Sequence, residues 1–181
     1  MRPLLAWIPI ILMLVFSACA IFGGSSEAGE GFVSTRADAV EKTESEWKTL
    51  LSSEEYRILR TAGTERAFTG RWWNNKDDGT YQCAACGLPL FDAETKFESG
   101  TGWPSFWLPI GEDHVATRSD ASLGVMRTEV LCNRCGGHLG HLFDDGPAPT
   151  GNRYCINGNA LDFVPLPEPS ADPETETPET K

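Results

Sequence analysis

The chain has 181 residues, of which 40% are hydrophobic and 10% aromatic, so it is long enough to build one packed core. Its formal net charge is −11 at pH 7. Lys and Arg supply most of the affinity of proteins for phosphate backbones, so this acidic composition disfavours a nucleic-acid-binding protein.

The chain begins with the layout of a secretory signal peptide. Residues 1–19 contain one basic residue, then an apolar run, then small residues. The segment Phe16-Ser17-Ala18-Cys19 resembles a lipoprotein box, in which Cys19 becomes the lipidated first residue. We therefore expect an exported protein of the periplasm or cell envelope, tethered to the membrane by a lipid anchor at Cys19.

Two other interpretations of this leader stay open. The segment Ala18-Cys19-Ala20 also fits ordinary signal-peptide cleavage, which would remove Cys19 with the leader. An uncleaved anchor is disfavoured, because the apolar run from Leu4 to Phe16 is interrupted by Pro9 and is shorter than the roughly 20 residues that a spanning helix needs.

The composition divides the rest of the chain into three parts. Residues 20–43 are rich in Gly, Ser, Ala and Glu and predict a flexible linker. Residues 44–166 carry the apolar pattern of a folded domain. Residues 167–181 alternate Pro with Glu, Asp and Thr, which predicts a disordered acidic tail because almost nothing in it is apolar.

The domain is expected to open with short helices. Trp47, Leu50 and Leu51 have the spacing of one helical face, and Ser52 followed by Glu55 predicts a capping box at the start of a second helix. From residue 68 onward the sequence changes to short β-like runs broken by turn signals, first to residue 110 and again from 125 to 164. This texture predicts a mainly β domain with one core.

Four cysteines form two Cys-x-x-Cys pairs. Cys83 and Cys86 make the first pair, Cys132 and Cys135 the second, with 45 residues between the pairs and a glycine after each. This spacing predicts a structural zinc site with four thiolate ligands, which is closed to substrate. Two disulfides remain an alternative, since an exported protein meets oxidants. A redox pair of the thioredoxin type is a weaker one, because the βαβ surroundings of that motif are missing.

Cys155 lies in neither pair and is a candidate nucleophile. If residues 153–157 form a strand, Arg153, Cys155 and Asn157 share one face by the two-residue period of strands. A cationic neighbour would favour the reactive thiolate. The alternative is a small buried hydrophobic cysteine, which is the commoner state of free cysteines.

The sequence around Cys155 is more specific than this pattern. The run from Gly137 to Pro147, followed by Pro149 to Asn157, closely resembles the signature of the methionine-R-sulfoxide reductases, the type B methionine sulfoxide reductases. The resemblance extends from about residue 44 to about residue 166. It includes Gly63-Thr64-Glu65-Arg66, Phe68-Thr69-Gly70, Phe97-Glu98-Ser99-Gly100, Gly102-Trp103-Pro104-Ser105-Phe106 and Arg127-Thr128-Glu129-Val130.

The resemblance implies a fold and a reaction. The fold is mainly β, with two antiparallel sheets in a β-tent-like arrangement, short N-terminal helices and a zinc site away from the active site. The reaction is the reduction of methionine-R-sulfoxide in oxidised proteins. Cys155 matches the cysteine that attacks the sulfoxide sulfur and becomes a sulfenic acid. His138 and His141 match the histidines that hold and protonate the sulfoxide oxygen, with His141 expected to be the closer donor.

Three further residues match positions around that cysteine. Trp103 matches the aromatic residue that receives the methyl group of the substrate. Arg153 is expected to favour the thiolate of Cys155, and Asn157 to orient water or substrate.

The chain departs from many family members in its cysteines. Those members carry a second, resolving cysteine, either in the loop that here runs from Thr64 to Ala67 or at the position of Thr101. We therefore expect a monomeric one-cysteine enzyme, whose sulfenic acid is reduced by an external thioredoxin-like thiol.

Two other classes of protein fit part of the pattern. A zinc-stabilised module could bind oxidised or Met-rich segments without turnover, and only the enzyme needs Cys155 as a free thiol of low pKa. A disulfide-stapled secreted scaffold would bind no metal and would keep its structure in the presence of a chelator.

Overall fold

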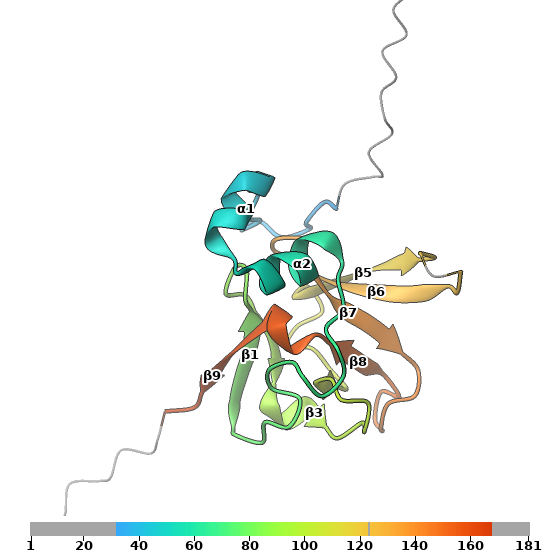
Figure 1. The fold of residues 1–181 in the computed structure, drawn as a ribbon. Coiled ribbons are helices and arrows are strands. Elements are labelled where there is room, and N and C mark those ends of the chain that lie inside the picture. Colours follow the sequence, from blue (N-terminus) through green and yellow to red (C-terminus); the bar gives the residue numbers. More distant parts are fainter. Residues whose placement is uncertain (1–31, 123, 168–181) are drawn as a thin grey trace, which may run out of the picture. The chain divides into compact units, whose positions relative to one another are not determined.

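The computed structural model describes residues 32–122 and 124–167. The expected signal peptide, the first part of the expected linker and nearly all of the expected tail lie outside these residues. Within them, two short helices precede a mainly β domain with two antiparallel sheets (Figure 1). The expected fold class is confirmed. In the described part of the chain, no helix combines the length and apolar content needed to cross a bilayer.

Both helices start with a capping box. Helix α1 (Glu44–Leu50) is capped by Thr43, and α2 (Ser53–Thr61) by Ser52, whose side chain accepts from the backbone of Glu55, as predicted. Trp47 and Leu51 are buried, but Leu50 is 61% exposed, so the helical face of the sequence is only partly a core face. Helix α2 contributes the buried residues Ile58 and Leu59 and packs beside strand β7.

The smaller sheet has three strands in the order β2-β1-β9. The larger sheet has six strands in the order β3-β4-β8-β7-β6-β5. In chain order the strands are β1 (Gly79–Cys83), β2 (Pro89–Asp92), β3 (Lys96–Phe97), β4 (Ser105–Phe106), β5 (Val115–Asp120), β6 (Arg127–Cys132), β7 (His138–Phe143), β8 (Arg153–Ile156) and β9 (Leu161–Pro165). Two 3-10 turns, Ala93–Thr95 and Gly158–Ala160, precede β3 and β9.

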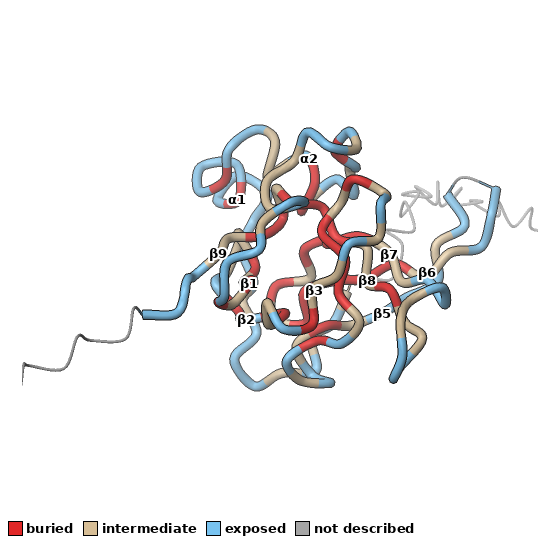
Figure 2. The backbone as a smooth tube through the Cα atoms, turned by 90° about the horizontal axis from the view of Figure 1, so that it is seen from below, coloured by how far each residue is buried: buried red, intermediate tan, exposed pale blue. Residues whose placement is uncertain are grey.

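Aromatic residues join the two sheets. Phe91 of β2 stacks on Phe106 of β4 with ring centroids 4.4 Å apart, and Tyr81 of β1 meets Phe106 edge-on at 5.0 Å. All three side chains are fully buried. Figure 2 shows the buried stretches gathered in the interior of the domain, with the turns and strand ends exposed. Because this core packs on one face of the larger sheet, it determines which way the opposite face of that sheet points.

The segment before α1 packs on the domain instead of serving wholly as a linker. Residues 32–42, here called the N-terminal strap, run along the turn that holds Cys132 and Cys135. The Asn133 side chain donates to Oγ1 of Thr35 at 2.8 Å, and the backbone N–H of Val40 donates to Arg134 O at 2.8 Å. The folded unit therefore begins before residue 44, which corrects the expected boundary. Composition missed this, because the strap is held by polar contacts to a distant turn.

Candidate functional site

Strand register assembles the candidate site on one face of the larger sheet. Cys155 of β8 lies opposite His141 of β7 and, on its other side, opposite Ser105 of β4. His141 lies opposite Glu129 of β6, which lies opposite Arg118 of β5. Directly opposed residues in a sheet point to the same side, so these five side chains form one row across the strands.

A β-bulge brings the second histidine to this face. The pairing of β6 with β7 shifts between Val130 and Leu131, so that Leu139 has no opposite partner. Residues three apart in a regular strand point to opposite faces, but one inserted residue restores the same face. His138 and His141 therefore lie together, with ring centroids 5.5 Å apart.

A cavity of about 150 Å³ opens over this row. Its lining residues are Thr64, Trp103, Arg127, Gly140, His141, Phe143, Cys155 and Asn157. Most of the residues predicted for the site thus meet in one hollow, while His138 lies buried beside it and is not part of its lining. A larger cavity of about 260 Å³ beside Lys96 and Glu98 has neither a cysteine nor a histidine in its lining.

Burial raises the pKa of the Cys155 thiol above its ordinary value of 9.0. Arg153, Thr101 and Ser105 act in the opposite direction, because a cation and hydrogen-bond donors stabilise the thiolate, but burial outweighs them. The role of Arg153 in favouring the thiolate stays a prediction. The net shift of the Cys155 pKa is upward, opposite to the low pKa that the sequence analysis linked to a reactive thiol.

Arg153 is held by a partner that the sequence did not single out. Its Nε and Nη2 donate to the two carboxylate oxygens of Asp145 at 2.7 and 2.9 Å. The guanidinium also lies over the ring of Phe143, with its central carbon 4.3 Å from the ring centroid. Because Asp145 neutralises much of this charge, Arg153 stabilises a thiolate at Cys155 less than a free cation would.

The Asn157 amide is engaged with backbone groups. Its Oδ1 accepts from the N–H of Glu65 at 3.0 Å, and its Nδ2 donates to Leu139 O at 2.9 Å. Strand β8 ends at Ile156, one residue earlier than the predicted strand. Asn157 thus ties the bulged residue of β7 to the loop at Glu65, whereas the sequence suggested that it orients water or substrate.

Glu65 is a buried residue that the sequence reasoning missed. Its carboxylate accepts from the N–H groups of Gly158 and Asn159 at 2.6 and 2.9 Å, and its carbonyl accepts from Nε1 of Trp103 at 3.2 Å. Burial raises the pKa of this carboxyl, and the backbone donors oppose that rise. Glu65 therefore fixes the indole of Trp103 relative to the end of β8.

Each histidine contacts a carboxylate from strand β5 or β6. Nδ1 of His138 lies 2.7 Å from Oε1 of Glu129, and Nε2 of His141 lies 2.8 Å from Oδ2 of Asp120. Burial lowers the pKa of His141, and its hydrogen bond to Asp120 opposes that shift. The sequence offered no signal for either pair, because the partners lie 9 and 21 residues away.

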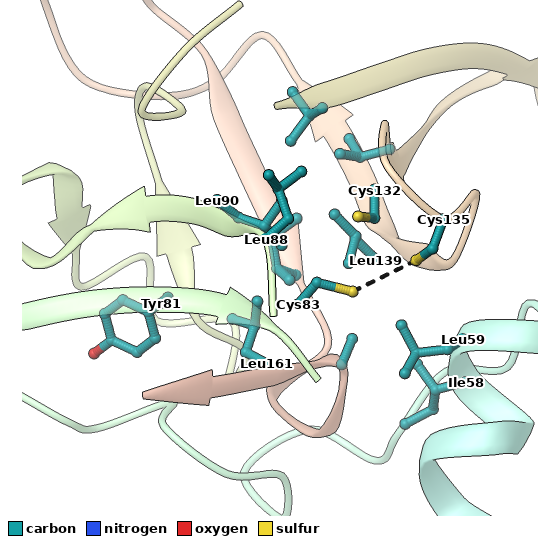
Figure 3. Packing of buried hydrophobic residues seen from close by; sticks show 14 of the residues in the cluster. Ile58, Leu59, Tyr81, Cys83, Leu88, Leu90, Cys132, Cys135, Leu139 and Leu161 are labelled. Atoms are coloured by element: carbon teal, nitrogen blue, oxygen red, sulfur yellow. Dashed lines mark hydrogen bonds between the residues drawn. The ribbon is translucent and has the colours of Figure 1, made fainter. Parts of the chain in front are cut away.

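The four paired cysteines form one cluster, and all their sulfur atoms lie within 4.8 Å of one another. Figure 3 shows three of them, Cys83, Cys132 and Cys135, beside the buried leucines of the core. Cys83 Sγ lies 3.8 Å from Cys135 Sγ, and Cys86 Sγ lies 3.5 Å from Cys132 Sγ. A disulfide bond is about 2.0 Å long, so these thiols are not bridged. Tetrahedral zinc with bonds of about 2.3 Å separates its sulfur ligands by about 3.8 Å, so the cluster fits that ion.

The cluster lies on the opposite face of the larger sheet from the histidines. Cys132 of β6 alternates with Leu131, and Leu131 lies opposite His138. By the two-residue period of strands, Cys132 therefore points away from the row that contains Cys155. This agrees with the expectation that the metal lies away from the chemistry.

Residues 51–165 match the family described as SelR domain. The chain belongs to this family. Curated relatives named peptide methionine sulfoxide reductase MsrB include those of Methanosarcina barkeri, 58% identical over 125 residues, and Thiobacillus denitrificans, 56% identical over 124 residues. These alignments cover 69% and 68% of this chain and 88% and 94% of the relatives. The N-terminal strap precedes the residues that match the SelR family.

The position of Thr101 matters for this SelR-family chain. Its hydroxyl lies 4.0 Å from the sulfur of Cys155. Thr101 occupies one of the places where the resemblance implies a resolving cysteine, and the other place includes Thr64, which lines the same cavity. Neither Thr101 nor the loop from Thr64 to Ala67 therefore supplies a second thiol for Cys155.

We expect replacement of Arg153 to slow alkylation of Cys155. In Arg153→Met the thiolate loses its cation, so its pKa rises further and alkylation by iodoacetamide at about pH 8 falls by about tenfold. The rate is measured by mass spectrometry of the Cys155 peptide. In the matched variant Asp145→Asn the guanidinium is released from its partner, and alkylation becomes faster. Equal rates in both variants would show that Arg153 has no electrostatic effect on the thiol.

Proposed function

We propose that this chain reduces methionine-R-sulfoxide in oxidised proteins to methionine, with Cys155 as the nucleophile. Family membership makes it an oxidoreductase, a peptide-methionine (R)-S-oxide reductase. The observation that carries the mechanism is the opposition of Cys155 and His141 across β8 and β7, under a cavity that Trp103 also lines. A nucleophile, a proton carrier and an apolar wall are thereby brought to one place.

The first step transfers one oxygen atom from the substrate sulfur to the sulfur of Cys155. The sulfur of Cys155 attacks the sulfoxide sulfur and forms an S–S bond, while the sulfoxide oxygen takes up a proton. The S–S bond and the original S–O bond to the methionine sulfur then break as the hydroxyl passes to the sulfur of Cys155. The products are methionine and a sulfenic acid at Cys155. The methionine sulfur gains two electrons and the cysteine sulfur loses two, so this step needs no outside reductant.

Histidine supplies the proton at the oxygen. His141 borders the cavity and lies opposite Cys155, and burial keeps its pKa below the ordinary value. An imidazole near Cys155 can take the thiol proton and return it to the sulfoxide oxygen. His138 lies beside His141 on the same face of the sheet, with ring centroids 5.5 Å apart.

Trp103 gives the site its preference for a methyl-bearing sulfoxide. Its ring lines the cavity, and its indole N–H is used by Glu65, so the ring is fixed while its face stays available. An aromatic face suits the methyl group on the substrate sulfur. The hydrogen bond from Trp103 to the loop therefore holds the wall in place without competing for the sulfoxide oxygen.

The sulfenic acid is reduced from outside the chain. Of the cysteines in the described residues, four form the metal cluster on the other face of the sheet, and Cys155 is the fifth. An external thioredoxin-like dithiol would attack the sulfenic sulfur, release water and form a mixed disulfide. Its second thiol would then release Cys155 as a thiol and leave the reductant oxidised.

The cysteine cluster is proposed to hold one structural zinc ion. When bound, zinc would link β1 and its following turn to the end of β6, since each contributes two ligands. We also propose that the protein is a monomer, exported and tethered to the membrane through Cys19. The leader motif Phe16-Ser17-Ala18-Cys19 supports that placement.

The reaction is tested by turnover of separated epimers. With dithiothreitol as reductant, the protein is expected to reduce the R epimer of a methionine-sulfoxide peptide and to leave the S epimer unchanged. Cys155→Ser should lose at least about 1,000-fold of this activity, because a hydroxyl is a far weaker nucleophile than a thiolate. A folded protein that reduces neither epimer would contradict the proposal and favour a module that binds oxidised segments without turnover.

The recycling route is tested by one turnover without reductant. Dimedone is expected to label Cys155 as a sulfenic acid, and the Cys-x-x-Cys thiols should remain unbridged. In Thr101→Cys a thiol stands within reach of Cys155, so the label is replaced by a disulfide between positions 101 and 155. Thr101→Ser is the control and should keep the label. An internal disulfide in the unmodified protein would exclude external reduction as the first recycling step.

Metal content is tested together with stability. We expect about one zinc ion per chain, and Cys86→Ser should lose the ion and its cooperative thermal unfolding, because binding free energy contributes to folding. Cys155→Ser is the matched control and should keep both. A metal-free protein with an unchanged melting temperature would show that the cysteine cluster is not a zinc site.

A further inference from the structure

The carboxylates that contact the two histidines come from one hairpin. Asp120 is the last residue of β5 and Glu129 lies in β6, and these strands pair along their whole length. The same hairpin supplies an arginine to each carboxylate. Arg127 contacts Asp120, and Arg118 contacts Glu129. Each histidine thus contacts one carboxylate, and that carboxylate contacts one arginine.

Asp120 is an anion at neutral pH. Its Oδ1 accepts from the backbone N–H of Ser122 at 2.9 Å, and its Oδ2 accepts from Nη2 of Arg127 at 2.5 Å. Hydrogen bonds from Ser122, then from His141 and Arg127, hold the pKa of Asp120 well below its usual range. An ionised carboxylate only accepts hydrogen bonds. The nitrogen of His141 that faces it, Nε2, therefore carries the hydrogen.

Glu129 acts on His138 in the same way but through the other ring nitrogen. Its side chain is 6% exposed, with Oε1 facing Nδ1 of His138 and Oε2 accepting from Nε of Arg118. Burial would raise the pKa of Glu129, but His138 and Arg118 hold it below its usual value. The carboxylate is ionised, so Nδ1 of His138 carries the hydrogen.

The two imidazoles are therefore held in opposite tautomers. The nitrogens left over are Nδ1 of His141 and Nε2 of His138. Nε2 of His138 is buried and has no hydrogen-bond partner among the described residues. A buried polar atom without a hydrogen-bond partner is rare and destabilises the fold, so it calls for a ligand or a role. Its ring lies on the Cys155 face of the sheet, beside His141.

We propose that Glu129 and Asp120 are positioning residues that fix His138 as the Nδ1–H tautomer and His141 as the Nε2–H tautomer. Nε2 of His138 and Nδ1 of His141 are then the nitrogens that are free to take up a proton and to pass it to the sulfoxide oxygen. The proposal rests on the proposed reaction. It assigns a function to the β5–β6 hairpin, whose residues never contact Cys155 in the strand register.

The tautomers can be measured in the unmodified protein by long-range proton–nitrogen-15 spectra of the full, metal-loaded chain. The chain has three histidines, and the variants His114→Asn and His141→Asn are needed only to assign their signals. At about pH 8, where imidazoles are neutral, His138 is expected as Nδ1–H and His141 as Nε2–H. An Nε2–H signal for His138 would overturn the proposal, whatever the activity of the protein.

The variant Glu129→Gln tests whether the tautomer matters for turnover. An amide can donate as well as accept, so His138 should shift toward Nε2–H, and kcat for the R epimer should fall by about 10- to 100-fold with little change in KM. Asp113→Asn, beside the remote His114, is the control and should change neither the His138 signal nor the turnover rate. If Glu129→Gln does not fold, Arg118→Met, at a half-exposed position, takes its place and should show a smaller change in the same direction.

The outcomes separate this proposal from the proposed reaction. If His138 is Nδ1–H but Glu129→Gln turns over like the unmodified protein, the carboxylate has no positioning role in catalysis and the inference is wrong. If the unmodified protein reduces neither epimer, the reaction itself fails, and the spectra still report whether the carboxylates fix the tautomers.

Discussion

The β-bulge at Leu139 is the constraint on which the site depends. Without it, His138 and His141 would point to opposite faces of β7, and only one of them could reach Cys155. Asn157 secures the bulge, because its Nδ2 donates to Leu139 O, and the backbone N–H of Asn157 donates to the same carbonyl. The amide of Asn157 therefore stabilises a backbone irregularity that would otherwise lose hydrogen bonds.

The two faces of strands β6 and β7 carry different kinds of residue. Glu129, His138 and His141 lie on the face that bears the cavity, while Val130 and Cys132 lie on the face that packs against the core and the cysteine cluster. The aromatic stack and the cysteine cluster both connect the larger sheet to β1 and β2. A sheet fastened on one face can hold side chains rigidly on the other, which a site that depends on hydrogen-bond geometry requires.

The sequence predicted the features that depend on local spacing. The capping box at Ser52 and the two Cys-x-x-Cys pairs are confirmed as structural elements, because their partners lie within a few residues or follow a known ligand geometry. Asp120 and Glu129 could not be found in this way. Their roles arise from strand register across β5, β6 and β7, and a two-residue period gives the face of a residue but not its opposite neighbour.

The charges around Cys155 suit a reaction that needs no net proton. Burial raises the pKa of the thiol and lowers that of His141, so the resting pair is a neutral thiol beside a neutral imidazole. A protonated thiol is a poor target for oxidants, because the thiolate is the reactive form. In the proposed reaction the thiol also carries the proton that the sulfoxide oxygen receives when it leaves the substrate sulfur. Because Asp145 limits the influence of Arg153, the guanidinium lowers the pKa of Cys155 less than a free cation would.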